Sequence, residues 1–329
     1  MTLVFARRAW CPLLVVGCLT VAPMPASAGF VVAGFNLASY ASVDDPTSLT
    51  FDAGGVLFTG RDNSGSGGGF GDAVRIHVVA AGGGVGVEFG TSTITDPDTV
   101  TIDLLGSITG IPGSVLVGGG TGTGSTRLSS VSPGGTVSEV FTTTLLSDIN
   151  AMAVDSTGRL LLGDDTGIHV TTGGPPTGLV GLGGPRAASL AVDSLDRIFV
   201  ATTDDAIRIY NSDGTLHDGA FYSGSGVLSL AFGNGGAFGH DLYAINTVSG
   251  ELLRFTSLGL PTVLGTGFNG DHLAFGPDHN LYIAEFDNDR ILRVSAVPEP
   301  ISIAMWLPAG LITCVAGLHR RGRKRSGCP

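Results

Sequence analysis

The fold is decided by a stretch that the chain repeats, and its clearest copy is AMAVDSTGRLLLGD at residues 151–164. A short apolar segment ends at Asp155, a turn containing Gly158 follows, and a second apolar segment begins at Leu160. Asp and Gly favour turns, and short apolar runs between turn residues are typical of buried strands. The stretch therefore predicts two strands joined by a tight turn.

The pattern returns five more times, less clearly toward the N-terminus. The copies are LAVDSLDRIFVAT at 190–202, LAFG at 230–233 with LYAIN at 242–246, LAFGPDHNLYIAE at 273–285, LTFD at 49–52 with VLF at 56–58, and VTID at 100–103 with VLV at 115–117. The residues that open the six turns are Asp52, Asp103, Asp155, Asp193, Gly233 and Gly276. They are spaced by 51, 52, 38, 40 and 43 residues, which are blade lengths of β-propellers.

Six units predict an all-β, six-bladed propeller over residues 29–296. The units lie at 49–98, 99–148, 149–187, 188–226, 227–269 and 270–296. The last unit supplies only three strands, and an incomplete ring would expose an apolar edge. We therefore expect the strand-like residues 30–36 to pair with residues 291–294 and close the ring. The four copies from Met152 to Val294 resemble NHL-type repeats, which implies the same fold.

The C-terminal segment, residues 297–329, has a different character from the body. Its apolar run at 301–318 is uncharged and would extend about 27 Å as a helix, close to the thickness of a bilayer core. The run lies between a Pro-Glu-Pro tripeptide and a basic cluster. These flanking residues are Pro298, Glu299 and Pro300 before it, and Arg320, Arg321, Arg323, Lys324 and Arg325 after it. The basic cluster favours a cytoplasmic C-terminus.

This order resembles the PEP-CTERM sorting signal. The resemblance implies that an exosortase-type enzyme recognises the tail and cleaves it. The two prolines keep the preceding segment extended, which suits a protease that needs an accessible strand. The alternative is a plain membrane anchor that is never cut.

The N-terminal segment, residues 1–28, has the pattern of a secretory signal peptide. Positive charge precedes an apolar run at 13–21, and the small residues Ala26 and Ala28 form a cleavage site for signal peptidase. The alternative is a lipobox in which Cys18 is lipidated.

The body between the two segments is acidic and contains no cysteine. The chain has 17 basic and 28 acidic residues; the terminal segments hold seven and one of them, which leaves 10 and 27 in residues 29–296, or a net charge near −17. Such a surface repels nucleic acid and anionic lipid. It suits divalent cations or neutral, hydroxyl-rich polymers, or it serves solubility alone. The lack of cysteine excludes a cysteine nucleophile and cysteine metal ligands in the body.

Polar residues at the end of the second strand of each unit are candidate ligands. Alignment of the copies places Gly60, Gly119, Asp164, Thr202, Asn246 and Glu285 at one equivalent position. Carboxylate and amide oxygens that converge at the mouth of a propeller could hold Ca²⁺ or another divalent cation. Asp164, Asn246 and Glu285 loosely resemble the metal site of gluconolactonase-like (SMP-30-type) propellers, which implies lactone hydrolysis. The alternative is that these residues are turn formers.

The sequence as a whole predicts an exported bacterial surface or extracellular-matrix protein. Its precursor would be anchored in the inner membrane through the tail, and cleavage would release it to the cell surface or the medium. We expect the propeller to be a non-enzymatic binding or scaffold module, with exopolysaccharide or a surface protein as partner and no nucleic acid. A metal-dependent, lactonase-like hydrolase is the alternative.

Overall fold

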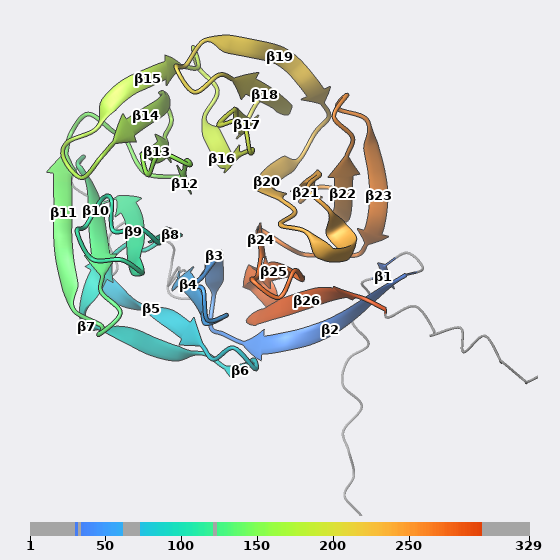
Figure 1. The fold of residues 1–329 in the computed structure, drawn as a ribbon, viewed down its shortest axis with the longest axis horizontal. Helices are drawn as coiled ribbons and strands as arrows, with labels where there is room; N and C mark the ends of the chain where they lie inside the picture. The colour runs from blue at the N-terminus through green and yellow to red at the C-terminus, as the bar shows by residue number, and fades with distance from the viewer. Residues whose placement is uncertain (1–29, 32–33, 62–72, 121–123, 298–329) are drawn as a thin grey trace, which may run out of the picture.

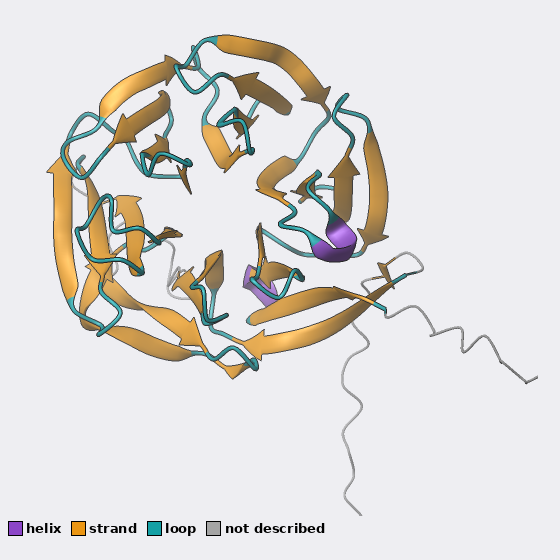
Figure 2. Cartoon of the chain, in the orientation of Figure 1, coloured by secondary structure: helices purple, strands orange, loops and turns teal. Residues whose placement is uncertain are grey.

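The protein is a six-bladed β-propeller in the computed structural model, which describes residues 30–31, 34–61, 73–120 and 124–297. Six sheets surround a central axis, with the first strand of each blade innermost (Figure 1). Helix within the described residues is limited to two 3₁₀ turns, η2 (Gly236–Phe238) and η3 (Phe286–Asn288) (Figure 2). The predicted all-β, six-bladed propeller is confirmed.

The blades follow one another along the chain, and their strands run outward from the axis in sequence order. Blade 1 contains β3 (Pro46–Phe51), β4 (Leu57–Arg61), β5 (Ala73–Val79) and β7 (Val87–Thr95). Blade 2 contains β8 (Thr99–Asp103), β9 (Ser114–Gly120), β10 (Thr126–Val131) and β11 (Val137–Thr143). Blade 3 contains β12 (Ala151–Val154), β13 (Leu160–Gly163), β14 (Gly167–Thr171) and β15 (Thr177–Gly181).

Blades 4 to 6 complete the ring. Blade 4 contains β16 (Ala187–Val192), β17 (Ile198–Thr202), β18 (Ala206–Tyr210) and β19 (Leu216–Ser223). Blade 5 contains β20 (Val227–Phe232), β21 (Leu242–Asn246), β22 (Glu251–Phe255) and β23 (Pro261–Thr266). Blade 6 contains β24 (His272–Phe275), β25 (Leu281–Glu285), β26 (Arg290–Ala296) and, from the N-terminus, β2 (Phe35–Ser42).

The N-terminal strand closes the ring as predicted, but its position in the chain differs. Strand β2 pairs antiparallel with β26, so the closing strand covers residues 35–42 and not 30–36. The preceding β1 (Phe30–Val31) pairs instead with β23 of blade 5. Gly34 has a φ of 98°, a conformation that favours glycine, and it separates the two strands. A short β6 (Gly84–Val85) adds to β2 in parallel.

The propeller has two faces with different loops. On the linker face lie the loops that join one blade to the next and those that join the second strand of a blade to the third. On the hairpin face lie the turns between the first and second strands and between the third and fourth. All strands and buried clusters of the described chain lie between Phe30 and Val297, so this segment has its own core.

The two predicted targeting segments lie outside the described residues. These include Ala26 and Ala28 at one end, and the tripeptide Pro298 to Pro300 and the basic cluster at the other. No helix in the described part of the chain is long and apolar enough to cross a membrane.

Candidate functional site

The aligned positions at the end of the second strand lie on the linker face, with one correction in blade 1. The strand of blade 1 begins at Leu57, which is the equivalent of Leu160 in blade 3. The residue four positions later is therefore Arg61, and the prediction of Gly60 was wrong. Val56 looks like a strand residue, but its carbonyl accepts the hydrogen bond that closes the preceding turn.

Asp164 is fully buried and fastens two loops of the linker face. Its carboxylate accepts hydrogen bonds from the backbone N–H groups of Ser147 at 3.2 Å and of Thr166 and Gly167 at 2.8 Å, and His169 Nε2 lies 3.3 Å away. Burial alone would raise the pKa of Asp164. Hydrogen bonds from His169, Thr166 and Gly167 outweigh burial and hold that pKa well below its usual range.

Glu285 and Asn246 also fasten loops of the linker face, each in its own blade. Glu285 is 1% exposed; it accepts a hydrogen bond from the Asn269 N–H at 3.0 Å and pairs with Arg290 Nε at 2.5 Å. Asn246 donates to the carbonyl of Ser225 at 2.8 Å and accepts two backbone N–H groups of the β21–β22 turn at 3.0 Å. In each case the side chain ties the loop after the second strand to the segment that leads into the first strand.

Asp164, Asn246 and Glu285 each hold two loops together, and each does so in a different blade. Two groups of three carboxylates in the described chain are close enough to share an ion, and neither contains Asp164 or Glu285. The groups are Asp44, Asp45 and Asp289, and Asp96, Asp98 and Asp148. The three residues are loop anchors in this structure, and their role as metal ligands stays a prediction.

A second set of polar residues joins the innermost strands of neighbouring blades, and sequence reasoning missed it. Each accepts a hydrogen bond from a backbone N–H of the next blade, and we call these contacts clasps. In the four clasps the acceptor is named first and the N–H donor second: Ser48 and Val100 at 2.8 Å, Ser189 and Leu230 at 3.0 Å, Ser229 and Leu273 at 3.0 Å, and His272 Nδ1 and Leu49 at 3.3 Å. Each acceptor stands directly before the Leu of a repeat copy, which was the available sequence signal; blade 3 has Ala151 there.

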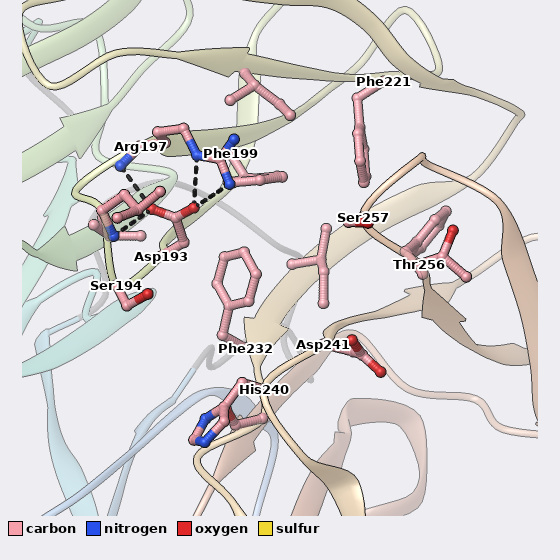
Figure 3. A pocket seen from close by; sticks show the side chains of 16 residues that line it. Asp193, Ser194, Arg197, Phe199, Phe221, Phe232, His240, Asp241, Thr256 and Ser257 are labelled. Carbon is pink, nitrogen blue, oxygen red and sulfur yellow. Dashed lines mark hydrogen bonds and ion pairs between the residues drawn. The ribbon is translucent and has the colours of Figure 1, made fainter.

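On the hairpin face, a cleft of about 570 Å³ lies between blades 4 and 5 (Figure 3). We call it the open cleft. Four phenylalanines line it: Phe199, Phe221, Phe232 and Phe255. Phe199 stands edge-to-face with Phe232, with ring centres 4.9 Å apart, and with Phe221 at 5.4 Å. Such edge-to-face pairs are the favoured geometry for aromatic side chains, so these walls are preformed.

The charged groups at the rim of the open cleft are already paired with one another. Asp193 accepts a hydrogen bond from Arg197 Nε at 2.7 Å, and Asp241 accepts one from Arg254 Nε at 2.6 Å. The rim also carries hydroxyl groups and the exposed His240 (Figure 3). The open cleft therefore combines an aromatic interior with a polar edge whose charges are balanced.

The equivalent cleft between blades 5 and 6 is filled by the chain itself. Nine residues separate β20 from β21, whereas five separate β16 from β17. The longer turn forms η2 and places Phe238, which is 1% exposed, against Tyr243 and Phe275 at ring-centre distances of 5.6 and 5.3 Å. Asn234 of the same turn donates to the carbonyl of Gly276 in blade 6 at 2.8 Å. We call this the filled cleft.

Comparisons with known proteins support the fold. No family model and no curated protein matches the chain. Solved propellers do. A gluconolactonase from Xanthomonas campestris has a TM-score of 0.58 and 15% identity, covering 81% of this chain and 91% of that one. The PQQ-bound aldose sugar dehydrogenase of Streptomyces coelicolor has a TM-score of 0.57 and 15% identity, covering 82% and 100%.

A third similar structure is virginiamycin B lyase from Staphylococcus aureus, with a TM-score of 0.56 and 13% identity, covering 80% of this chain and 100% of that one. The likeness is one of fold. These proteins have different activities on the same architecture, so the architecture does not select among them.

Proposed function

We propose that this chain is an exported bacterial surface or matrix protein, sorted by an exosortase-type system, whose propeller is a binding module and not an enzyme. The observation that carries the binding role is the open cleft. Its aromatic walls pack edge-to-face, its rim charges are paired with one another, and its volume is that of a ligand pocket. Such a cavity recognises shape and apolar surface.

The sorting role is supported by the sequence of the tail and by where the described chain ends. The backbone N–H of Val297 donates to the carbonyl of Gly34 at 2.9 Å, at the outer edge of blade 6. A tether that begins there would leave both faces of the propeller accessible. Residues 297–329 would hold the precursor at the inner membrane until cleavage.

Mass spectrometry of the exported protein tests the sorting role. We expect the mature species to begin at Gly29 and to end within the tail, upstream of the apolar run. Substitution of Pro298, Glu299 and Pro300 by alanine should leave an uncut precursor in the membrane. A mature species that is intact through Pro329 would refute sorting by cleavage and would leave the plain anchor.

The alternative, a lactonase-like hydrolase that uses Asp164, Asn246 and Glu285, has a separate test. Calcium or zinc added to the purified segment 29–297 should raise its melting temperature, and Asn246→Ala should abolish that rise, if a metal site exists. The binding-module proposal predicts no metal-dependent rise and no turnover of a lactone. A rise that Asn246→Ala abolishes, with lactone turnover, would replace the proposal by the hydrolase.

A further inference from the structure

The filled cleft indicates what occupies a cleft of this kind. Tyr243 and Phe275 are the second residue of β21 and the last of β24, and their rings lie 5.2 Å apart. Phe199 and Phe232 hold the same strand positions one blade earlier, at 4.9 Å. In the filled cleft Phe238, from the turn of blade 5, packs against both rings and also against Phe35 of β2, at 4.8 Å. The turn of blade 4 is too short to supply one, so no ring from that turn stands beside Phe199 and Phe232; Phe221 of β19 packs against Phe199 instead, at 5.4 Å.

The segment that delivers Phe238 has a simple sequence. It reads Gly235-Gly236-Ala237-Phe238-Gly239, so one phenylalanine stands among small residues. The chain contains this pattern a second time, as Gly67-Gly68-Gly69-Phe70-Gly71. Residues 62–72 lie outside the described part of the chain, but the strands on either side of them are described.

Those flanking strands decide which molecule Phe70 can reach. Segment 62–72 leaves β4 after Arg61 and enters β5 at Ala73, so both of its ends lie on the linker face of blade 1. The open cleft lies on the hairpin face between blades 4 and 5. These two blades stand across the ring from blade 1 (Figure 1). Eleven residues reach out and back by at most about 19 Å, so the segment serves another molecule more readily than its own.

We propose that the open cleft receives Phe70 of a second copy of this chain. The glycines around Phe70 give the ring access to the cleft, and edge-to-face contacts with Phe199 and Phe232 hold it there, as Tyr243 and Phe275 hold Phe238. Exposed apolar side chains beside the cleft enlarge the contact, because Leu195 on its wall is 72% exposed and Leu258, next to Ser257, is 79% exposed.

The contact joins different surfaces of the two molecules, the linker face of one and the hairpin face of the next. A heterologous contact of this type leaves a free donor segment at one end and a free cleft at the other, so assembly continues into chains. The inference rests on the proposed role as a binding module, and it identifies a copy of the protein itself as the partner.

Sedimentation velocity of segment 29–297 over a range of concentrations tests the proposal. Phe70→Ala removes the donor ring, and Ser257→Trp fills the open cleft at its exposed rim. Ser249→Trp is the matched control, at an exposed serine of the linker face in blade 5. We expect the wild type and the control to grow beyond dimers with concentration, in the micromolar to millimolar range of a contact built on few anchors, and each of the two variants to stay monomeric.

The mixture of the two variants is decisive, because together they hold one intact donor and one intact cleft. Equal amounts of Phe70→Ala and Ser257→Trp should form a 1:1 dimer and nothing larger. A mixture that stays monomeric, or association of Phe70→Ala equal to that of the wild type, overturns the proposal. Melting curves confirm that every variant is folded.

A foreign aromatic ligand is the competing occupant, and N-acetylphenylalanine amide is the probe for it. If the wild type stays monomeric while the amide binds it and not Ser257→Trp, the cleft takes a foreign ring and the self-association proposal fails. The proposed function would survive that result. It fails separately, by metal-dependent lactone turnover or by an uncut tail.

Discussion

Blade 5 has two neighbours, and the difference between its two interfaces separates structure from function in this propeller. Toward blade 6, η2 places a phenylalanine in the cleft and the interface is closed. Toward blade 4, the equivalent ring pair, Phe199 and Phe232, borders a cavity of about 570 Å³. The innermost two strands pair in the same way on both sides. The turn between them is longer in blade 5, and Phe35 of β2 also packs against Phe238, with ring centres 4.8 Å apart. In this repeat fold the strands build the ring, and the turns decide which clefts between blades stay open.

The largest expected effect comes from opening the filled cleft. Phe238→Ala removes a fully buried ring and should lower the free energy of unfolding by about 3–5 kcal/mol, measured by urea denaturation. Phe232→Ala is the matched change in the open cleft, where the ring is already partly exposed, and it should cost clearly less. Equal losses from the two variants would mean that the clefts do not differ as described.

The clasp at the ring closure should respond to acid. Burial lowers the pKa of His272 from 6.5 to about 4, so the neutral imidazole accepts the Leu49 N–H near neutral pH. Between pH 6.5 and 4 only the unfolded chain binds the proton, so the free energy of unfolding should fall by up to about 3 kcal/mol on acidification through this window, and it should be fully retained above it.

His272→Ser is the control for this pH dependence, because serine already makes the clasps of blades 1, 4 and 5. The variant should keep the clasp and lose most of the slope of stability against pH between 6.5 and 4. An unchanged slope in the variant would assign the acid response to other groups. Urea denaturation at a series of pH values measures both proteins.

The serine clasps should not distinguish the two interfaces of blade 5. Ser189 joins blade 4 to blade 5, and Ser229 joins blade 5 to blade 6, each at 3.0 Å and each buried. Alanine at either position leaves a buried N–H without its acceptor and should cost about 1–3 kcal/mol. Similar losses in the free energy of unfolding would mean that the two interfaces differ on the hairpin face alone. A much larger loss for Ser229→Ala would mean that their innermost strands differ as well.

The smallest effect on stability is expected at the rim of the open cleft. Leu195 is 72% exposed, so Leu195→Ser should change the free energy of unfolding by less than about 0.5 kcal/mol. The same variant should weaken self-association, because it removes apolar surface beside the cleft. A destabilisation of several kcal/mol would show that the leucine is part of the core.

The sequence was sufficient for the ring and for its closure by an N-terminal strand, but that strand covers residues 35–42 and not the predicted 30–36. Strand pairs such as Val154 with Leu160 follow from apolar runs separated by Asp and Gly turns, and the missing fourth strand of blade 6 called for an N-terminal partner. The register failed by one residue at Gly60, because Val56 is apolar but closes a turn. Local composition does not distinguish an apolar turn residue from the start of a strand.

The candidate site was less accessible to sequence reasoning. Asp164 and Glu285 stand at the predicted position, but a sequence does not reveal that their oxygens are used by backbone N–H groups and by Arg290. The open cleft is formed by residues of two blades, and it depends on a turn that fails to reach across. The wide gap between 230–233 and 242–246 was visible in the sequence; the direction in which Phe238 points was not.

A disulfide trap tests the central claim most directly, namely that the open cleft is the docking site for the segment around Phe70. The segment 29–297 contains no natural cysteine, so introduced thiols have no competitors. Gly69→Cys in one molecule and Ser257→Cys in another should form an intermolecular disulfide, which requires Cα atoms within about 7 Å. Ser249→Cys should not cross-link with Gly69→Cys. Equal cross-linking at positions 249 and 257, or none at either, would contradict the account.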